Sequence, residues 1–162
     1  MATVNPRKQL LNDLAASSGR ELGVTDWLTV SAAEADAFDI ATGLAPDFDL
    51  HPPGPVRPLP VNPFHLTVLT ARFGAEVGFP TATDDYITAL NYGFDNLTWH
   101  DDLRPGDQVR DRITVLDLTE RAEDRYILRA KHVFENRTGG TVMTVTTRSY
   151  YLLLDPSAKA NA

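Results

Sequence analysis

Two carboxylates and an imidazole lie close together in the most proline-rich part of this sequence. Asp47, Asp49 and His51 fall within residues 44–63, which hold seven of the chain's eleven prolines. This density of proline excludes a helix or a central strand, so we expect a stiff extended loop. Long loops in compact domains are usually functional or mobile, and carboxylates and imidazoles suit proton transfer. His51 could equally be a solvent-exposed loop residue, and the aspartates could be turn formers.

The other three histidines occupy different settings. His65 falls in the first turn of an expected helix, where it is either a core residue or a pocket residue kept neutral by the helix dipole. His132 lies on the apolar face of an expected strand, as a structural or pocket-lining residue, and His100 is expected at the surface. The sequence has no His-x-x-x-His pair and no cysteine. We therefore expect no metal site.

Composition indicates the class of protein. With 162 residues, 43% of them apolar and 23% charged, the chain is expected to form a single globular domain. Its net charge of −7 argues against nucleic-acid binding. No apolar run approaches the roughly 20 residues that span a membrane, and the N-terminus lacks the apolar core of a secretory signal. We expect a cytoplasmic protein with neither nucleic acid nor membrane as partner.

Residues 61–78 predict one long helix around which the other elements are arranged. Asn62 is expected as its N-cap and Pro63 at its first position, where no backbone N–H is needed. Helical spacing then predicts a broad buried stripe formed by Phe64, Val68 and Ala71 and widened by Leu66, Leu69 and Phe73.

The remaining pattern predicts an α+β architecture. Short helices are expected at residues 6–18 and, from a capping box at Ser31 and Glu34, at residues 31–42. Extended segments are expected at residues 22–30, 86–94, 97–100, 109–118, 126–135 and 141–154. A curved antiparallel sheet could then wrap the long helix, and its free edge favours a dimer. We predict an N-terminal helical extension at residues 1–20, one domain at 21–154 and a disordered tail at 155–162.

Four segments together resemble one family. They are GVTDWLTV at residues 23–30, FDIATG at 38–43, LNYGFD at 90–95 and LRPGD at 103–107. In this order they resemble the MaoC-like hot-dog dehydratases and hydratases over roughly residues 20–154. The resemblance implies a hot-dog fold with a central helix wrapped by an antiparallel sheet, in a dimer. It also implies an acyl thioester of coenzyme A or a carrier protein as substrate, reversible addition of water across a 2-enoyl double bond, and no cofactor.

The expected catalytic pair is displaced in this chain. The family places an aspartate directly after the Thr-Gly and a histidine five residues later, but Leu44 follows Thr42 and Gly43. Asp47 or Asp49, together with His51, would take over the acid–base roles. At the helix start, Asn62 and Pro63 replace the family's His-Gly, before Phe64. Asn62, Phe64 and His65 are the predicted substrate-binding residues, while Arg104 and Arg110 could meet a carrier phosphate or simply form a solvated face.

Three functions remain open from the sequence. The first is a hydro-lyase that uses the displaced Asp/His pair on acyl thioesters. The second is a repurposed hot-dog enzyme of secondary metabolism, catalysing cyclisation, isomerisation or dehydration of a polyketide-like substrate. The third is a non-catalytic hot-dog subunit that associates with a catalytically complete chain.

Overall fold

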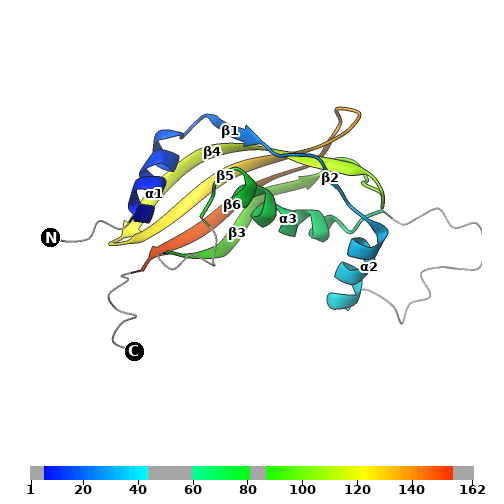
Figure 1. Ribbon diagram of the computed structural model, residues 1–162, viewed down its shortest axis with the longest axis horizontal. Coiled ribbons are helices and arrows are strands. Elements are labelled where there is room, and N and C mark those ends of the chain that lie inside the picture. The colour runs from blue at the N-terminus through cyan, green and yellow to red at the C-terminus, as the bar shows by residue number, and fades with distance from the viewer. Residues whose placement is uncertain (1–5, 44–59, 81–86, 155–162) are drawn as a thin grey trace, which may run out of the picture.

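Six antiparallel strands form one curved sheet in the structure, a computed structural model that describes residues 6–43, 60–80 and 87–154 (Figure 1). The strand order is β1-β4-β5-β6-β3, and β2 pairs separately with β4. The strands are β1 (Glu21–Val24), β2 (Leu28–Thr29), β3 (Ile87–Trp99), β4 (Gln108–Ala122), β5 (Arg125–Asn136) and β6 (Thr141–Leu153). The predicted α+β architecture is confirmed.

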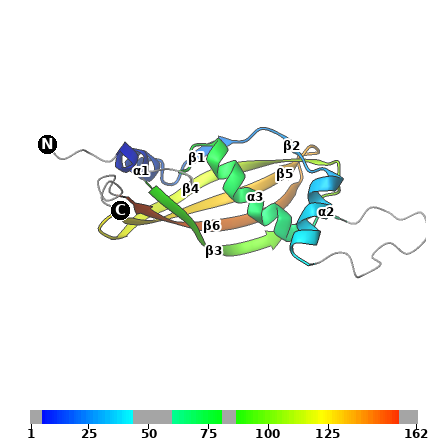
Figure 2. The same ribbon diagram turned by 60° about the horizontal axis from the view of Figure 1, so that its bottom comes forward.

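Three helices accompany the sheet, and only one lies across it. Helix α3 (Pro63–Glu76) packs against one face of the sheet, which we call the helix face (Figure 2). Helix α1 (Pro6–Ala16) packs against β4 near one end of the sheet, and α2 (Ala32–Ala41) lies at the other. No helix in the described residues is long and apolar enough to cross a membrane.

The helix starts follow from local sequence, as predicted. The Ser31 side chain accepts from the backbone N–H of Glu34, whose carboxylate accepts in return from Ser31, completing the capping box of α2. Asn62 caps α3 through its side chain, and Pro63 occupies the first helical turn.

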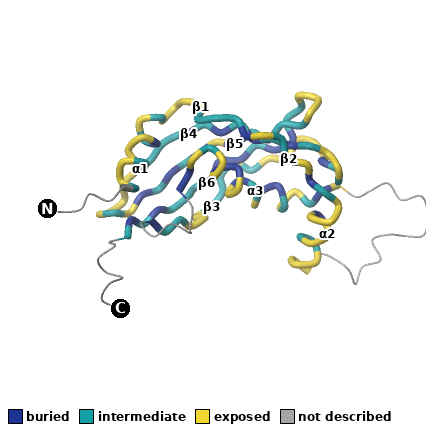
Figure 3. The backbone as a smooth tube through the Cα atoms, viewed as in Figure 1, coloured by how far each residue is buried: buried dark blue, intermediate teal, exposed yellow. Residues whose placement is uncertain are grey.

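The alternation of inward and outward side chains explains how the strands are placed in the sheet. Residues of β4 and β5 alternate between buried and partly exposed, and Figure 3 shows burial concentrated along the central strands. His132 lies on the apolar face of β5 as expected, and the residues of that face are all buried: Tyr126, Leu128, Ala130, His132 and Phe134. The opposite side of the sheet, which we call the outer face, carries charged and hydroxyl side chains.

Two predictions about strands need correction. The segments expected at 86–94 and 97–100 form a single strand, β3, because bulges near Asn91 and Asn96 absorb the irregular pattern between them. Asn96 takes a positive φ of 52°, which an asparagine tolerates better than most residues. The segment expected at 22–30 divides instead into β1 and β2.

The buried face of α3 differs from the expected stripe. Leu66 and Phe73 are buried as expected, together with Thr67, Thr70 and Gly74. Phe64 and Val68, however, are 57% and 53% exposed, and Ala71 is exposed as well. The helix is apolar on two sides, and the sheet covers only one. Periodicity alone could not tell which side would face the sheet.

The end of α3 approaches the following chain closely at Gly74. A Cβ at this position would lie 2.8 Å from the Phe79 ring. Only glycine accommodates this contact without displacing Phe79.

Candidate functional site

The predicted substrate-binding residues meet where α2 approaches the start of α3. Asn62 accepts a hydrogen bond from the backbone N–H of Phe64 at 2.9 Å. Its amide also donates to the carboxylate of Asp39 on α2, at 3.3 Å. Asn62 is thus the predicted cap and in addition ties the two helices together.

His65 presents a neutral imidazole at this corner. Its ring stacks on Phe38 of α2, with centroids 4.9 Å apart and planes 9° apart. Burial lowers the pKa of His65, and the nearby carboxylates of Glu34 and Asp39 only partly oppose this. Its Nδ1 is buried and finds no hydrogen-bond partner among the described residues. That nitrogen is therefore a buried polar atom that the described residues leave unpaired.

Phe64 forms an exposed aromatic pair with Trp99 of β3. Their rings meet edge to face with centroids 5.3 Å apart. Beside them, Trp99 also lines a small cavity of about 160 Å³ together with Val61, Pro63 and Leu66. The two rings extend the corner as an apolar surface.

The predicted catalytic residues lie outside the described residues. Asp47, Asp49 and His51 belong to residues 44–59, so their roles stay predictions. The described elements on either side of this segment, α2 and α3, are in contact through Asn62 and Asp39.

A second group of polar residues, within the core, was largely missed from the sequence. Asp111 of β4 and His132 of β5 form a buried pair, with Asp111 Oδ2 2.5 Å from His132 Nδ1 and exposures of 0% and 1%. His132 Nε2 lies 3.1 Å from the hydroxyl of Thr147 on β6. The backbone N–H of Asp111 donates to the Thr25 hydroxyl. A hydrogen-bonded chain Asp111–His132–Thr147 therefore crosses three strands.

One signal in the sequence could have revealed this pair. Asp111 interrupts an inward apolar series on its strand, between Val109 and Ile113, and His132 interrupts the inward series of the next strand. Ile113 pairs in register with His132, which brings Asp111 beside the imidazole. Polar residues at inward positions of two consecutive strands indicate a contact between them.

A cavity of about 240 Å³ adjoins this pair between α3 and strands β3, β5 and β6. His132 and Thr147 contribute to its wall, so the prediction that His132 is structural or pocket-lining agrees with the structure. The whole lining comprises Thr70, Ala71, Phe79, Pro80, Ala89, Leu90, Asn91, His132, Thr147, Ser149 and Tyr151. The cavity is therefore part apolar and part polar.

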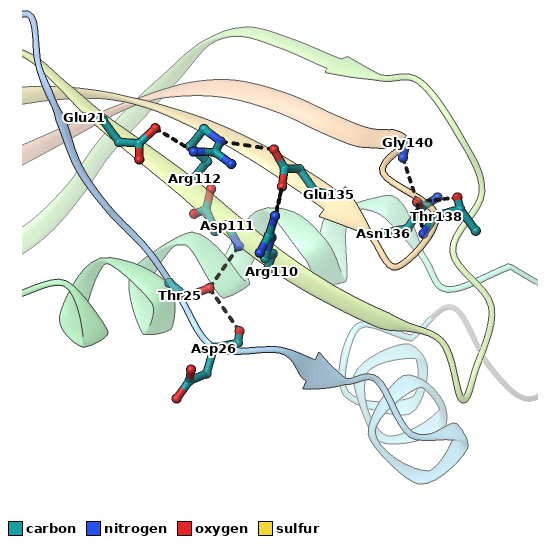
Figure 4. A network of polar contacts seen from close by, with 10 residues as sticks. All are labelled: Glu21, Thr25, Asp26, Arg110, Asp111, Arg112, Glu135, Asn136, Thr138 and Gly140. Carbon is teal, nitrogen blue, oxygen red and sulfur yellow. Dashed lines mark hydrogen bonds and ion pairs between the residues drawn. The ribbon is translucent and has the colours of Figure 1, made fainter.

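The outer face of the same strands carries an exposed charge network (Figure 4). Glu135 receives hydrogen bonds from Arg110 at 2.8 Å and Arg112 at 3.1 Å, and Arg112 also pairs with Glu21. Partial burial acts to raise the pKa of Glu135, but the two guanidinium groups outweigh it and lower the pKa. Arg110 also stacks over Trp27, 4.7 Å from the ring centroid. Arg110 is thus engaged within the protein.

Within the part of the chain that the structure describes, no group of three or more His, Asp or Glu side chains could hold a metal ion.

Comparison with known structures identifies the class of fold. The MaoC-like dehydratase from Rhodospirillum rubrum matches with a TM-score of 0.63 at 24% identity, covering 90% of this chain and 97% of that one. The (R)-hydratase from A. caviae, involved in PHA biosynthesis, matches with a TM-score of 0.60 at 17% identity, covering 82% and 94%. The chain therefore has the hot-dog fold of these proteins, as the sequence predicted.

A third similar structure is an assembly of two different chains. The ChsH1-ChsH2 complex from Mycobacterium tuberculosis matches with a TM-score of 0.58 at 17% identity, covering 85% of this chain and 98% of that one. No protein-family model and no curated protein sequence matches the chain.

Proposed function

We propose that this chain is a hydro-lyase that adds water to, or removes it from, an acyl thioester of coenzyme A or a carrier protein. The observation that carries the proposal is the shared fold, which covers nearly all of this chain and of the R. rubrum dehydratase. The four collinear segments between residues 23 and 107 support it from the sequence.

In this proposal His51 and one of Asp47 or Asp49 form the acid–base pair. In the hydration direction the carboxylate orients a water molecule, which attacks C3 of the 2-enoyl thioester as the imidazole takes its proton. The same proton then returns to C2, so the reaction is balanced without an added reagent. Dehydration is the reverse.

The corner formed by α2 and α3 would hold the thioester end of the substrate. His65 offers a buried Nδ1 without a partner among the described residues, and Asn62 fixes the approach of the two helices. Phe64 offers an exposed aromatic surface. Pro63 stands where the family has a glycine, and it has no backbone N–H to donate to the thioester carbonyl. The carbonyl therefore needs another donor, and His65 is our candidate.

We further propose that the chain forms a homodimer. Strand β3 is the last strand of the sheet at one side, and apolar side chains are exposed around it and on α3. These exposed side chains are Phe64, Val68, Leu90, Tyr92 and Trp99. Paired β3 edges in a dimer would cover this surface. Val68→Glu should shift the molecular mass measured by light scattering to that of a monomer, whereas a mass unchanged from wild type would contradict the proposed interface.

The activity itself is tested by hydration of crotonyl-coenzyme A and 2-octenoyl-coenzyme A, followed as loss of enoyl absorbance. We expect turnover in wild type, loss in His51→Ala, and near wild-type turnover in His100→Ala. His100 is an exposed histidine bonded to Thr144, which makes it a matched control. Absence of turnover in wild type on both thioesters contradicts the hydratase proposal.

A second candidate is favoured by Leu44, which follows Thr42-Gly43 where the family has its aspartate. The chain would then be a non-catalytic subunit of a two-chain hot-dog complex, or an enzyme of secondary metabolism with a changed pocket and a polyketide-like substrate. Turnover that is insensitive to His51→Ala, or that appears only after a second hot-dog chain is added, would favour this candidate.

A further inference from the structure

The cavity between α3 and the sheet is lined by both apolar and polar groups. Ala71 of α3, Phe79 and Pro80 supply apolar groups. Thr147 and Ser149 of β6 supply neighbouring hydroxyl groups, which we call the polar wall, because residues two apart on a strand face the same way. A ligand that fills this cavity therefore meets methyl and ring groups together with hydroxyl groups.

Asp111 and His132 support the polar wall from within the core. With the Asp111 carboxylate as acceptor, His132 carries its proton on Nδ1, and Nε2 faces the Thr147 hydroxyl at 3.1 Å. The Thr147 hydroxyl has a further, long contact of 3.5 Å with the backbone oxygen of Ala130. The Thr147 hydroxyl is therefore held in one orientation, because its partners His132 and Ala130 belong to the closely packed core.

A purely apolar ligand would not explain why Asp111, His132 and Thr147 are buried beside the cavity. Burying an ionisable pair is costly, and apolar residues of similar volume are often as stable or more so. An unbranched hydrocarbon chain would also leave the remaining acceptor lone pairs of the cavity hydroxyls unused. A ligand hydroxyl opposite Thr147 and Ser149 removes this cost.

We propose that this cavity selects an acyl chain bearing a hydroxyl group beyond C3, which hydrogen-bonds to Thr147 and Ser149. Asp111 and His132 act as positioning residues behind Thr147. The inference rests on the proposed function for the acyl nature of the ligand, and it adds the substrate class: a hydroxylated rather than a plain acyl chain.

Binding of free acids tests the proposal without requiring turnover. The probes are octanoate and its 5-, 6- and 7-hydroxy derivatives, measured by titration calorimetry on the full chain. We expect at least one hydroxy acid to bind wild type about 10-fold more tightly than octanoate, as one added hydrogen bond allows. Thr147→Val should abolish this ratio, and Ser149→Ala should reduce it.

Thr146→Val is the matched control. It makes the same substitution at the neighbouring residue, which faces the outer side of β6 and not the cavity. It should leave the ratio unchanged. Asp111→Asn keeps the shape of the side chain, and it should lower the ratio if Asp111 positions Thr147, an effect that a purely structural role would not produce.

Three outcomes overturn the proposal: equal binding of octanoate and all three hydroxy acids, a preference that survives in Thr147→Val, or no binding of any acid. Failure of the hydratase assay with the binding preference intact would instead overturn the proposed reaction and leave the ligand preference standing.

Discussion

Strands β4 and β5 carry one set of ionisable side chains on each face, and the two sets differ in residue type and in depth of burial. On the helix face, Asp111 and His132 pair within the core at exposures of 0% and 1%. On the outer face, Arg110, Arg112 and Glu135 pair within reach of water, with side-chain exposures of 18–37%. The two sets lie only one or a few residues apart along each strand.

The comparison separates stability from function. A solvated charge network costs little to form and contributes little. A buried pair must offset the loss of hydration of both groups, so it contributes little net stability. Its presence in the core therefore favours a functional role in binding or positioning. Of the two sets, the buried one also adjoins a cavity.

The largest expected effect is the loss of one member of the buried pair. Asp111→Ala should lower the free energy of unfolding by about 3–5 kcal/mol, since it leaves the buried imidazole without its partner. Chemical denaturation measures this change. The double variant Asp111→Leu, His132→Leu should lose less than the sum of the two single variants. Additive losses would show that the pair behaves like the exposed network.

A smaller effect is expected at the residue that supports Asp111 through the backbone. Thr25→Val removes the acceptor of the Asp111 N–H, which is 2.9 Å from the Thr25 hydroxyl. A loss of about 1–2 kcal/mol in unfolding free energy is expected from the unpaired buried donor. Thr25→Ser, which keeps the hydroxyl, should recover most of it, and equal losses in both variants would contradict this account.

The outer network should respond weakly and in a salt-dependent way. Glu135→Gln should cost no more than about 1 kcal/mol at low salt, and less at high salt. Because the folded-state pKa of Glu135 is lowered, its contribution is present above its ordinary pKa and is lost as the pH falls through the lowered value. Denaturation at several acidic pH values should therefore show a smaller pH dependence in Glu135→Gln, and an unchanged slope would contradict the expectation.

The smallest effect is expected at His65, which is neither buried nor fully exposed. Its pKa is lowered, so its stabilising contribution is complete above its ordinary pKa of about 6.5 and is lost as the pH falls through the lowered value. His65→Gln should flatten the stability profile on the acidic side, measured by thermal unfolding from pH 7 downward. His100→Gln provides the control, and the same flattening there would rule out His65 as the cause.

Local patterns in the sequence were sufficient to predict most elements of the fold. The capping box at Ser31 and Glu34 and the Asn62-Pro63 helix start each depend on neighbouring residues alone. The inward series of β5 follows from strand periodicity, which the sheet then realises. These features needed no knowledge of distant contacts.

The parts that could not be predicted depend on tertiary contacts. The exposed side of α3, with Phe64 and Val68, depends on which face the sheet covers. The contact between Asp111 and His132 depends on the register of β4 against β5. The predicted substrate-binding residues came from the family resemblance and the expected helix start, whereas the buried Nδ1 of His65, without a partner among the described residues, came only from the structure.

Gly74 has a consequence for how this cavity could change over evolution. A side chain there would displace Phe79, which lines the cavity, and the three atoms nearest to an added Cβ all belong to the Phe79 ring. One methyl group at position 74 would thus alter the size of the cavity and leave its hydrogen bonds intact, whereas substitutions at Thr147 would do the reverse. Chain length and chain chemistry could therefore be selected independently, each through a single codon.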